Sequence, residues 1–273
     1  MPELIEVELY RRAMDPLVGG VVTALEVRHP DFVRPSGTPP EVLSVLQGGQ
    51  LVATRRHGKL LLLDVALSPL HEGSAAGIAC DSATVGLRFG MTGMLFVDGV
   101  GPIHRLEYAS AKADVAWDRF VLTIGEATVT LRDQRRLGSV ELDPDTSVLG
   151  AEATTIDSSE LARVVASRRR AIKSLLLDQS LVAGLGNLLV DEVLWRAGVA
   201  PHRAANELSS AEVTLLAETI RSTVADLSDR GGSHMGDSFP HRVPGAVCPN
   251  GDGNMERSTV GGRTSWWCPG HQS

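Results

Sequence analysis

Residues 178–201 read DQSLVAGLGNLLVDEVLWRAGVAP, and this stretch decides the fold expected for the second half of the chain. Leucines recur in it at helical spacing, but Gly184 and Gly186 interrupt them just before Asn187. The pattern predicts two helices joined by a glycine turn, the second beginning near Asn187 and stopping before Gly198. Such a turn can offer backbone N–H groups to a phosphate, although two ordinary core helices would give the same pattern.

The first half of the chain has a different pattern. Between Val21 and Val140, short apolar segments of strand length alternate with Gly, Pro, Asp and Ser. This alternation predicts a β-sandwich or a flattened barrel. A helix is expected before it, from Pro2 to about Leu17.

A polar stretch at residues 143–157 separates these strands from further predicted helices at 158–167 and 207–227. We therefore expect an α+β protein with three parts. They are an N-terminal helix with a β-sandwich at residues 1–148, a helical domain at 149–235 and a loop with a β-hairpin at 236–273.

The bulk composition limits the class of protein. A chain of 273 residues that is 43% hydrophobic can build one large core or two medium ones. No apolar run approaches membrane-spanning length, and the charged N-terminus lacks the core of a signal peptide, so a cytoplasmic protein with no membrane partner is expected. Three cysteines, Cys80, Cys248 and Cys268, are too few for a disulfide scaffold.

The net charge of −7 argues against nonspecific binding to nucleic acid, which normally needs a basic domain. The positive residues are nevertheless clustered, and a folded chain could gather the clusters on one face for phosphates. They are Arg55, Arg56 and Lys59; Arg132, Arg135 and Arg136; and Arg168, Arg169, Arg170 and Lys173.

Four motifs carry a resemblance to a known family. The stretch at 172–201 resembles the helix-two-turn-helix of the formamidopyrimidine-DNA glycosylase and endonuclease VIII family. PELIEVE at 2–8 is similar to the family's PELPEVE opening, RRHGK at 55–59 to RRxGK, and DQRRLG at 133–138 to DPRRFG. The resemblance covers Pro2 to His271. It implies a DNA glycosylase and abasic-site lyase, a monomer that binds duplex DNA containing a damaged base or an abasic site and associates with the nucleoid.

The expected nucleophile is the chain terminus. Removal of Met1 would leave Pro2 with a free amine, and an α-amino group, with a reference pKa of about 7.7–8.0, is partly neutral at working pH. A neutral amine can attack a sugar C1′ and form an iminium. By itself a Pro-Glu start is simply a favourable helix beginning. By resemblance, Pro2 is the nucleophile and Glu3 the acid, Lys59 assists elimination, and Arg263 grips a phosphate and takes part in the second elimination.

The resemblance also implies residues that contact DNA. Met91 would fill the gap left by an extruded base, Arg135 would take the pairing edge of the opposite base, and Leu137 replaces the family's phenylalanine wedge. Without the resemblance, Met91 and Leu137 would be read as ordinary core residues. The other implied contact residues are Glu6, Arg88, Arg136, Arg168, Lys173 and Asn187, and the loop at 229–245 would read the everted base.

The resemblance further implies a zinc finger at the C-terminus. Cys248 and Cys268 hold the positions of two ligands and His271 that of a third, but Gly251 stands where another cysteine is expected. Zinc is the expected metal, with Asp252 as a potential fourth ligand, and no organic cofactor is expected. The alternative is a hairpin without metal that is held by its tryptophans.

The opening residues and the paired arginines place the chain nearer the oxidised-purine branch, with 8-oxoguanine and formamidopyrimidines as substrates. One alternative is an endonuclease VIII-like enzyme for oxidised pyrimidines or abasic sites. Another is a non-catalytic protein that binds damaged DNA. A helix-turn-helix regulator would leave the Pro2-Glu3 start unexplained.

Overall fold

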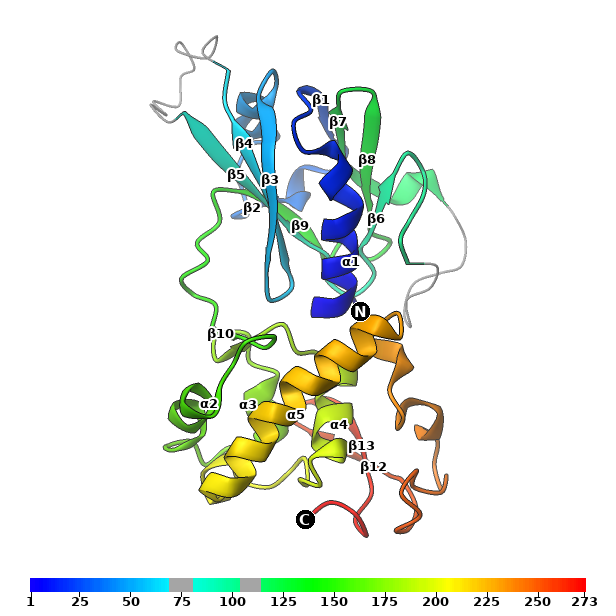
Figure 1. The fold of residues 1–273 in the computed structure, drawn as a ribbon. Coiled ribbons are helices and arrows are strands. Elements are labelled where there is room, and N and C mark those ends of the chain that lie inside the picture. Colours follow the sequence, from blue (N-terminus) through cyan, green and yellow to red (C-terminus); the bar gives the residue numbers. More distant parts are fainter. Residues whose placement is uncertain (69–80, 104–113) are drawn as a thin grey trace. The chain divides into compact units, whose positions relative to one another are not determined.

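The computed structural model describes residues 1–68, 81–103 and 114–273, and Cys80 lies outside these ranges (Figure 1). The chain divides into two compact units. The first contains residues 1–2 and Glu6–Thr146, and the second contains Glu3–Ile5 and Ser147–Ser273. Helices and sheets together confirm the α+β class expected from the sequence.

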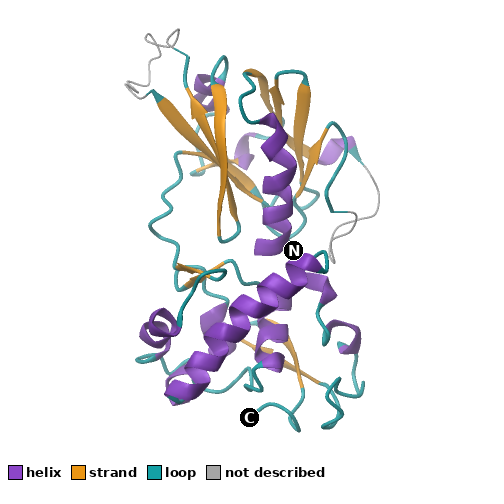
Figure 2. Cartoon of the chain, viewed as in Figure 1, coloured by secondary structure: helices purple, strands orange, loops and turns teal. Residues whose placement is uncertain are grey.

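The first unit holds two β-sheets and most of helix α1 (Leu4–Met14), as Figure 2 shows. One sheet has the order β1-β7-β8-β6, and the other has the order β2-β9-β5-β4-β3. All strand pairs are antiparallel except β2 with β9. The strands are β1 (Val22–Val27), β2 (Val33–Arg34), β3 (Gln50–His57), β4 (Leu60–Ala66), β5 (Ser82–Arg88), β6 (Met94–Val97), β7 (Asp118–Ile124), β8 (Ala127–Arg132) and β9 (Ser139–Leu142).

Helix α1 packs its apolar side into the core of this unit. Val7, Tyr10 and Met14 are fully buried, as expected for residues spaced three and four apart on one helix face. The Tyr10 ring lies 4.6 Å from the ring of Phe89. The α-helix ends at Met14, earlier than predicted, and continues as a short 3₁₀ helix that contains Pro16, a residue that cannot donate a helical hydrogen bond.

The second unit is mainly helical. Helices α2 and α5 both begin with capping boxes, formed by Asp157 with Glu160 and by Ser209 with Glu212. The elements are β10 (Ala151–Glu152), α2 (Ser158–Val165), α3 (Ile172–Leu176), β11 (Val182–Ala183), α4 (Asn187–Arg196), α5 (Ser210–Asp229), β12 (Glu256–Val260) and β13 (Arg263–Trp267). Short 3₁₀ helices occur in the two units at Asp15–Leu17, Pro30–Phe32, Pro40–Leu46, Val115–Trp117, Ala205–Glu207, Ser233–Met235 and Phe239–His241.

The glycine-interrupted stretch does not form the first helix that its leucine spacing predicts. Helix α4 begins at Asn187 as predicted, but residues 178–186 are not helical, and the first helix of the pair is α3. The Gln179 amide explains the difference, because it donates to the Leu177 and Leu185 carbonyls and accepts from the Gly184 N–H. This side chain therefore satisfies backbone groups that helical hydrogen bonds would otherwise use.

Helix α4 is apolar nearly all round and occupies the centre of the second core. Two acidic residues on it, Asp191 and Glu192, are also buried. In the part of the chain that the structure describes, no helix combines the length and apolar character needed to cross a membrane.

Candidate DNA-repair site

Glu3 is the most strongly held of the expected catalytic residues. Its carboxylate accepts hydrogen bonds from the backbone N–H groups of Gly186 (2.8 Å), Leu188 (2.8 Å) and Leu189 (3.1 Å), and the Leu4 N–H donates to the Gly184 carbonyl at 3.1 Å. The side chain is 1% exposed. Glu3 therefore acts as the anionic cap of helix α4, where N–H groups lack partners within the helix.

Gly186 is required by this contact. A Cβ atom at this position would lie 2.2 Å from the Glu3 Cδ atom, closer than any real contact. A glycine turn of this kind can offer backbone N–H groups to a phosphate. Here the N–H groups of Gly186, Leu188 and Leu189 are not available for that, because the Glu3 carboxylate already occupies them.

Asn187 keeps a free polar atom. It is the first residue of α4 and is half-buried, and its Oδ1 atom is buried with no hydrogen-bond partner among the described residues. Buried polar atoms in proteins are nearly always paired, so an amide oxygen without a partner at this helix start suits a group that donates a hydrogen bond to it.

Three loops of the first unit meet at one end of the five-stranded sheet. Leu60 pairs with Arg88, and Arg88 pairs with Ser139, so the turn before β4, the loop after β5 and the loop before β9 are neighbours. A Cβ atom on Gly138 would lie 2.5 Å from the Arg88 carbonyl oxygen. The sheet register thus places three segments side by side: the turn with Lys59, the loop with Met91 and the loop with Arg135–Leu137.

A buried carboxylate, Asp133, shapes two of these loops. It accepts hydrogen bonds from the Leu137 and Gly138 N–H groups, both at 2.7 Å, from the Arg135 N–H, and from the Thr92 hydroxyl next to Met91. Asp133 is 0% exposed. One side chain therefore links the Met91 loop to the 135–137 loop. Asp133 is the first residue of the DQRRLG motif, but the motif by itself does not show that this side chain holds the loops.

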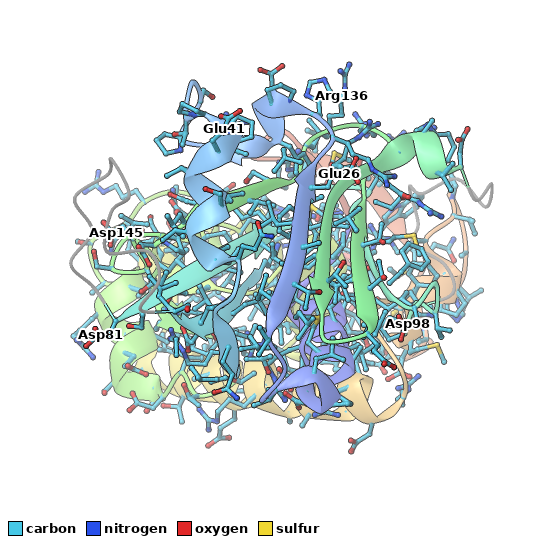
Figure 3. All side chains as sticks on the ribbon, turned by 90° about the horizontal axis from the view of Figure 1, so that it is seen from above. Glu26, Glu41, Asp81, Asp98, Arg136 and Asp145 are labelled. Carbon is cyan, nitrogen blue, oxygen red and sulfur yellow. The ribbon has the colours of Figure 1, made fainter. Side chains whose placement is uncertain are left out.

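The three residues at the tip of the 135–137 loop are exposed. Leu137 is 49% exposed, which excludes the reading of this residue as ordinary core packing. The Arg135 guanidinium lies 3.5 Å from the sulfur of the half-buried Met91. Arg136, which is labelled in Figure 3, has a φ of 55°, a value that is uncommon outside glycine. Its guanidinium lies 2.6 Å from His29 Nε2.

Arg88 and Arg168 already interact with the protein. The Arg88 guanidinium lies 3.8 Å from the Glu141 carboxylate, and the Arg168 guanidinium donates to the Val164 carbonyl at 2.7 Å, at the end of α2. Both remain partly exposed. Glu6, in contrast, is buried in α1.

Lys173 is not a surface residue. Its ammonium donates to the Asp191 carboxylate at 2.6 Å and to the Thr264 carbonyl at 2.7 Å, and the side chain is 0% exposed. Burial lowers the pKa of Lys173 and raises the pKa of Asp191. The expectation that Lys173 contacts DNA is therefore wrong for this structure, because the side chain has no exposed surface that a phosphate could reach.

Arg263 lies at the tip of the β12–β13 hairpin. It follows Gly261 and Gly262, whose φ angles of 57° and 73° fit a tight two-residue turn. A Cβ atom on Gly261 would lie 2.3 Å from the Ser174 hydroxyl, so the turn packs directly on α3. The guanidinium is thereby presented on the surface of the second unit, beside the helix-two-turn-helix.

The residues expected to bind zinc do not fit a metal site. Among the described residues, no three His, Cys, Asp or Glu side chains come together around a common point. Cys248 Sγ accepts the indole N–H of Trp195, and the two His271 ring nitrogens face the Trp195 carbonyl oxygen at 2.9 Å and the Asp252 carboxylate at 3.1 Å. Gly251 offers no side chain, so the four-ligand arrangement of a structural zinc site is not formed.

The comparisons with known proteins agree with this architecture. The N-terminal domain model of formamidopyrimidine-DNA glycosylase matches residues 1–140, and the H2TH domain model of the same enzyme matches residues 149–237. Formamidopyrimidine-DNA glycosylase of Paracoccus denitrificans is 34% identical, over 98% of this chain and 99% of that protein. The corresponding Jannaschia protein is 31% identical over 100% of both chains.

A solved structure of Lactococcus lactis Fpg in complex with abasic-site DNA has the same fold. The TM-score is 0.80 with 24% identity, and the match covers 100% of both chains. Both matched domain models are those of a DNA glycosylase, which defines the class of protein. The chain belongs to the formamidopyrimidine-DNA glycosylase family. This confirms the family and the base-excision glycosylase activity, with its abasic-site lyase step, that the sequence motifs implied.

Proposed function

We propose that this glycosylase removes oxidised purines from duplex DNA and then cleaves the strand, with the amine of Pro2 as the nucleophile. The damaged nucleotide is turned out of the stack, since its C1′ is not accessible within the duplex. The Pro2 nitrogen bonds to C1′ as the bond to the base breaks, and the base leaves with a proton. The sugar ring then opens as the C1′–O4′ bond breaks and the ring oxygen takes a proton, which leaves an iminium between Pro2 and C1′. The iminium lowers the barrier to the two eliminations that release the sugar from its 3′ and 5′ phosphates.

The observation that carries this proposal is the anchoring of Glu3. Three hydrogen bonds fix the residue directly after Pro2, so that the start of the chain has one defined position. Holding a nucleophile in place supplies a large part of a catalytic effect. We infer that Glu3 has two roles, as the anchor of Pro2 and as the carboxyl that moves a proton at the ring oxygen or the departing base. Protonation would weaken its contacts with α4, because a neutral carboxyl is a poorer acceptor.

The remaining expected residues divide into three groups in this proposal. Lys59 and Arg263 act on the phosphates next to the lesion, and Lys59 is also a candidate proton donor in elimination. Met91 fills the gap left by the everted base, Arg135 takes the pairing edge of the opposite base, and Leu137 is the wedge between base steps. Further DNA contacts come from Arg88, Arg136, Arg168 and Asn187. Glu6 is not among them, because its side chain is buried in α1.

The position of Leu137 supports the proposal that this residue still acts as a wedge between base steps. This large apolar side chain is half exposed at the tip of a loop shaped by Asp133, a position that suits insertion between base steps. We also propose that the enzyme acts as a cytoplasmic monomer and that its three-part organisation at 1–148, 149–235 and 236–273 corresponds to catalysis, duplex binding and lesion contact.

Borohydride trapping on an abasic-site duplex tests the nucleophile. The unmodified protein should form a covalent adduct, and Pro2→Gly should lose most of it while its dissociation constant for the duplex changes by less than about threefold. Pro16→Gly is the matched control, since Pro16 is exposed and lies in the 3₁₀ helix after α1. It should trap as the unmodified protein does.

Two outcomes would redirect the proposal. An unchanged adduct with Pro2→Gly that peptide mapping places away from the N-terminal residue would move the nucleophile to a lysine. No adduct with any variant would support a non-catalytic damage-binding protein. Duplexes that contain 8-oxoguanine, a formamidopyrimidine or an oxidised pyrimidine then test the substrate class. Faster excision of the oxidised pyrimidine would favour the endonuclease VIII-like alternative.

A further inference from the structure

The C-terminal hairpin lacks one of the four ligands of a zinc finger, at Gly251, but keeps a fixed position on the second unit. We propose that the hairpin segment, residues 248–273, folds and presents Arg263 without any metal ion, because helix α4 supplies the contacts that a metal would otherwise provide. The role of Arg263 in binding DNA rests on the proposed function. The metal-free folding of the hairpin segment does not depend on that function.

The first of these contacts is the Asp191 carboxylate of α4. It accepts hydrogen bonds from the Ser265 hydroxyl at 3.2 Å and the Trp266 N–H at 3.3 Å, and it pairs with Lys173 and Arg242. The carboxylate is 2% exposed. One buried anion thus ties β13 to α3 and α4, in the way a metal ion ties together its ligands.

The second contact is made by the last turn of α4. The Trp195 indole N–H donates to Cys248 Sγ at 3.4 Å, and the His271 ring lies 5.6 Å from the Trp195 ring centre and 2.9 Å from its carbonyl oxygen through Nε2. Cys248 and His271 are therefore both bound to α4, while Cys248 also interacts with Cys268 and His271 with Asp252. These contacts join the two ends of the hairpin segment to the same residue.

The third contact is the tail of the chain. The Gln272 side chain donates to the Val199 carbonyl at 2.9 Å and accepts from the Cys268 N–H at 2.8 Å. The Ser273 N–H donates to the Gly198 carbonyl at 3.0 Å. Gln272 is 3% exposed, so these hydrogen bonds are shielded from water.

An apolar cluster completes the arrangement. Trp195, Cys248, Met255, Trp266 and Cys268 are all buried against one another. Zinc fingers generally need their metal because a short hairpin has no core of its own. Here the core is shared with α4, since Trp195 belongs to the helix and the other four residues belong to the hairpin segment. The usual reason for a metal requirement is thereby removed.

Metal analysis of the full-length protein is the first test. Protein expressed with added zinc and purified without chelators should hold well under one zinc ion per chain. Hydrogen exchange at the β12 and β13 amides should be equally slow with and without a chelator. One tightly held zinc per chain, together with faster exchange in this hairpin after chelation, would overturn the proposal.

Two substitutions separate the metal-free arrangement from a metal site. Cys248→Ser should leave hairpin exchange within about threefold, because a serine hydroxyl can still accept the Trp195 N–H, whereas a zinc site would lose a ligand. Asp191→Asn should raise hairpin exchange and weaken binding to an abasic-site duplex by about tenfold or more. Asp229→Asn, on the exposed end of α5, is the control for loss of a negative charge.

The outcomes are distinct from those of the function proposal. Fast hairpin exchange in Cys248→Ser but not in Asp191→Asn would contradict the metal-free arrangement. If Asp191→Asn fails to fold, the zinc content and the chelator experiment on the unmodified protein still decide. A protein without borohydride adduct but with a metal-free, protected hairpin would refute the proposed catalysis and leave this inference standing.

Discussion

Replacing Gly186 with alanine should detach Glu3 from helix α4 and thereby misplace Pro2. Gly186 has φ −121° and ψ −169°, a conformation that alanine adopts without strain, so the effect of the substitution is purely steric. The added Cβ atom would lie 2.2 Å from Glu3 Cδ and 2.4 Å from Oε1. Because the backbone of α4 is fixed in the core, the Glu3 carboxylate is the group that must move.

The expected cost follows from the hydrogen bonds that are lost. A hydrogen bond to a charged acceptor contributes about 1.5–3 kcal/mol, so losing two of the three contacts with Glu3 should destabilise the protein by about 3–6 kcal/mol. The helix also loses an anion at its N-terminus, which adds about 0.3–1 kcal/mol. The free energy of unfolding should fall measurably, and the adduct formed per folded molecule should fall with it.

Urea unfolding and borohydride trapping measure the two effects separately. Gly150→Ala is the matched control, since its Cβ atom would lie 2.3 Å from the Leu181 backbone, an equally severe contact in the same unit. It should lose stability, yet its folded fraction should trap abasic-site DNA as the unmodified protein does. A Gly186→Ala protein with unchanged unfolding midpoint and unchanged adduct yield would refute the anchoring role of Glu3.

Three further outcomes are expected. Asp133→Ala should release the loop at 135–137 and weaken binding to an abasic-site duplex by at least about tenfold in a filter or anisotropy assay, since each lost contact with a buried carboxylate costs about 1.5–3 kcal/mol. Leu137→Ala should slow lesion excision while thermal melting shows a change below about 0.5 kcal/mol, because the side chain is half exposed. The Arg203 and Ser209 hydrogen bonds lower the pKa of Glu212 to about 2 from 4.5. The stability that this carboxylate contributes is present above pH 4.5 and is lost as the pH falls toward 2. After allowance for solvent screening it amounts to about 1 kcal/mol. Glu212→Gln should therefore reduce the change in melting temperature between pH 4.5 and pH 2.

The sequence by itself determined the architecture and most of the candidate residues. Local signals were sufficient wherever one segment decides its own structure, as for the start of α4 at Asn187, the capping residues of α5 and the strand segments of the first unit. The same is true of family membership, because the motifs that carry it are continuous in the chain.

Tertiary structure decided what each of those residues contacts. Nothing in the sequence near Glu3 shows that its carboxylate caps a helix more than 180 residues later, with separations of 183 to 186 positions in the chain. Lys173 reads as one of four clustered cations, yet it is buried because Asp191 lies across from it. The spacing of Cys248, Cys268 and His271 suggests a metal site, but spacing cannot show that Trp195 already binds two of them. Hydrogen bonds and burial depend on distances in space, and residues far apart in sequence acquire those distances only when the chain folds.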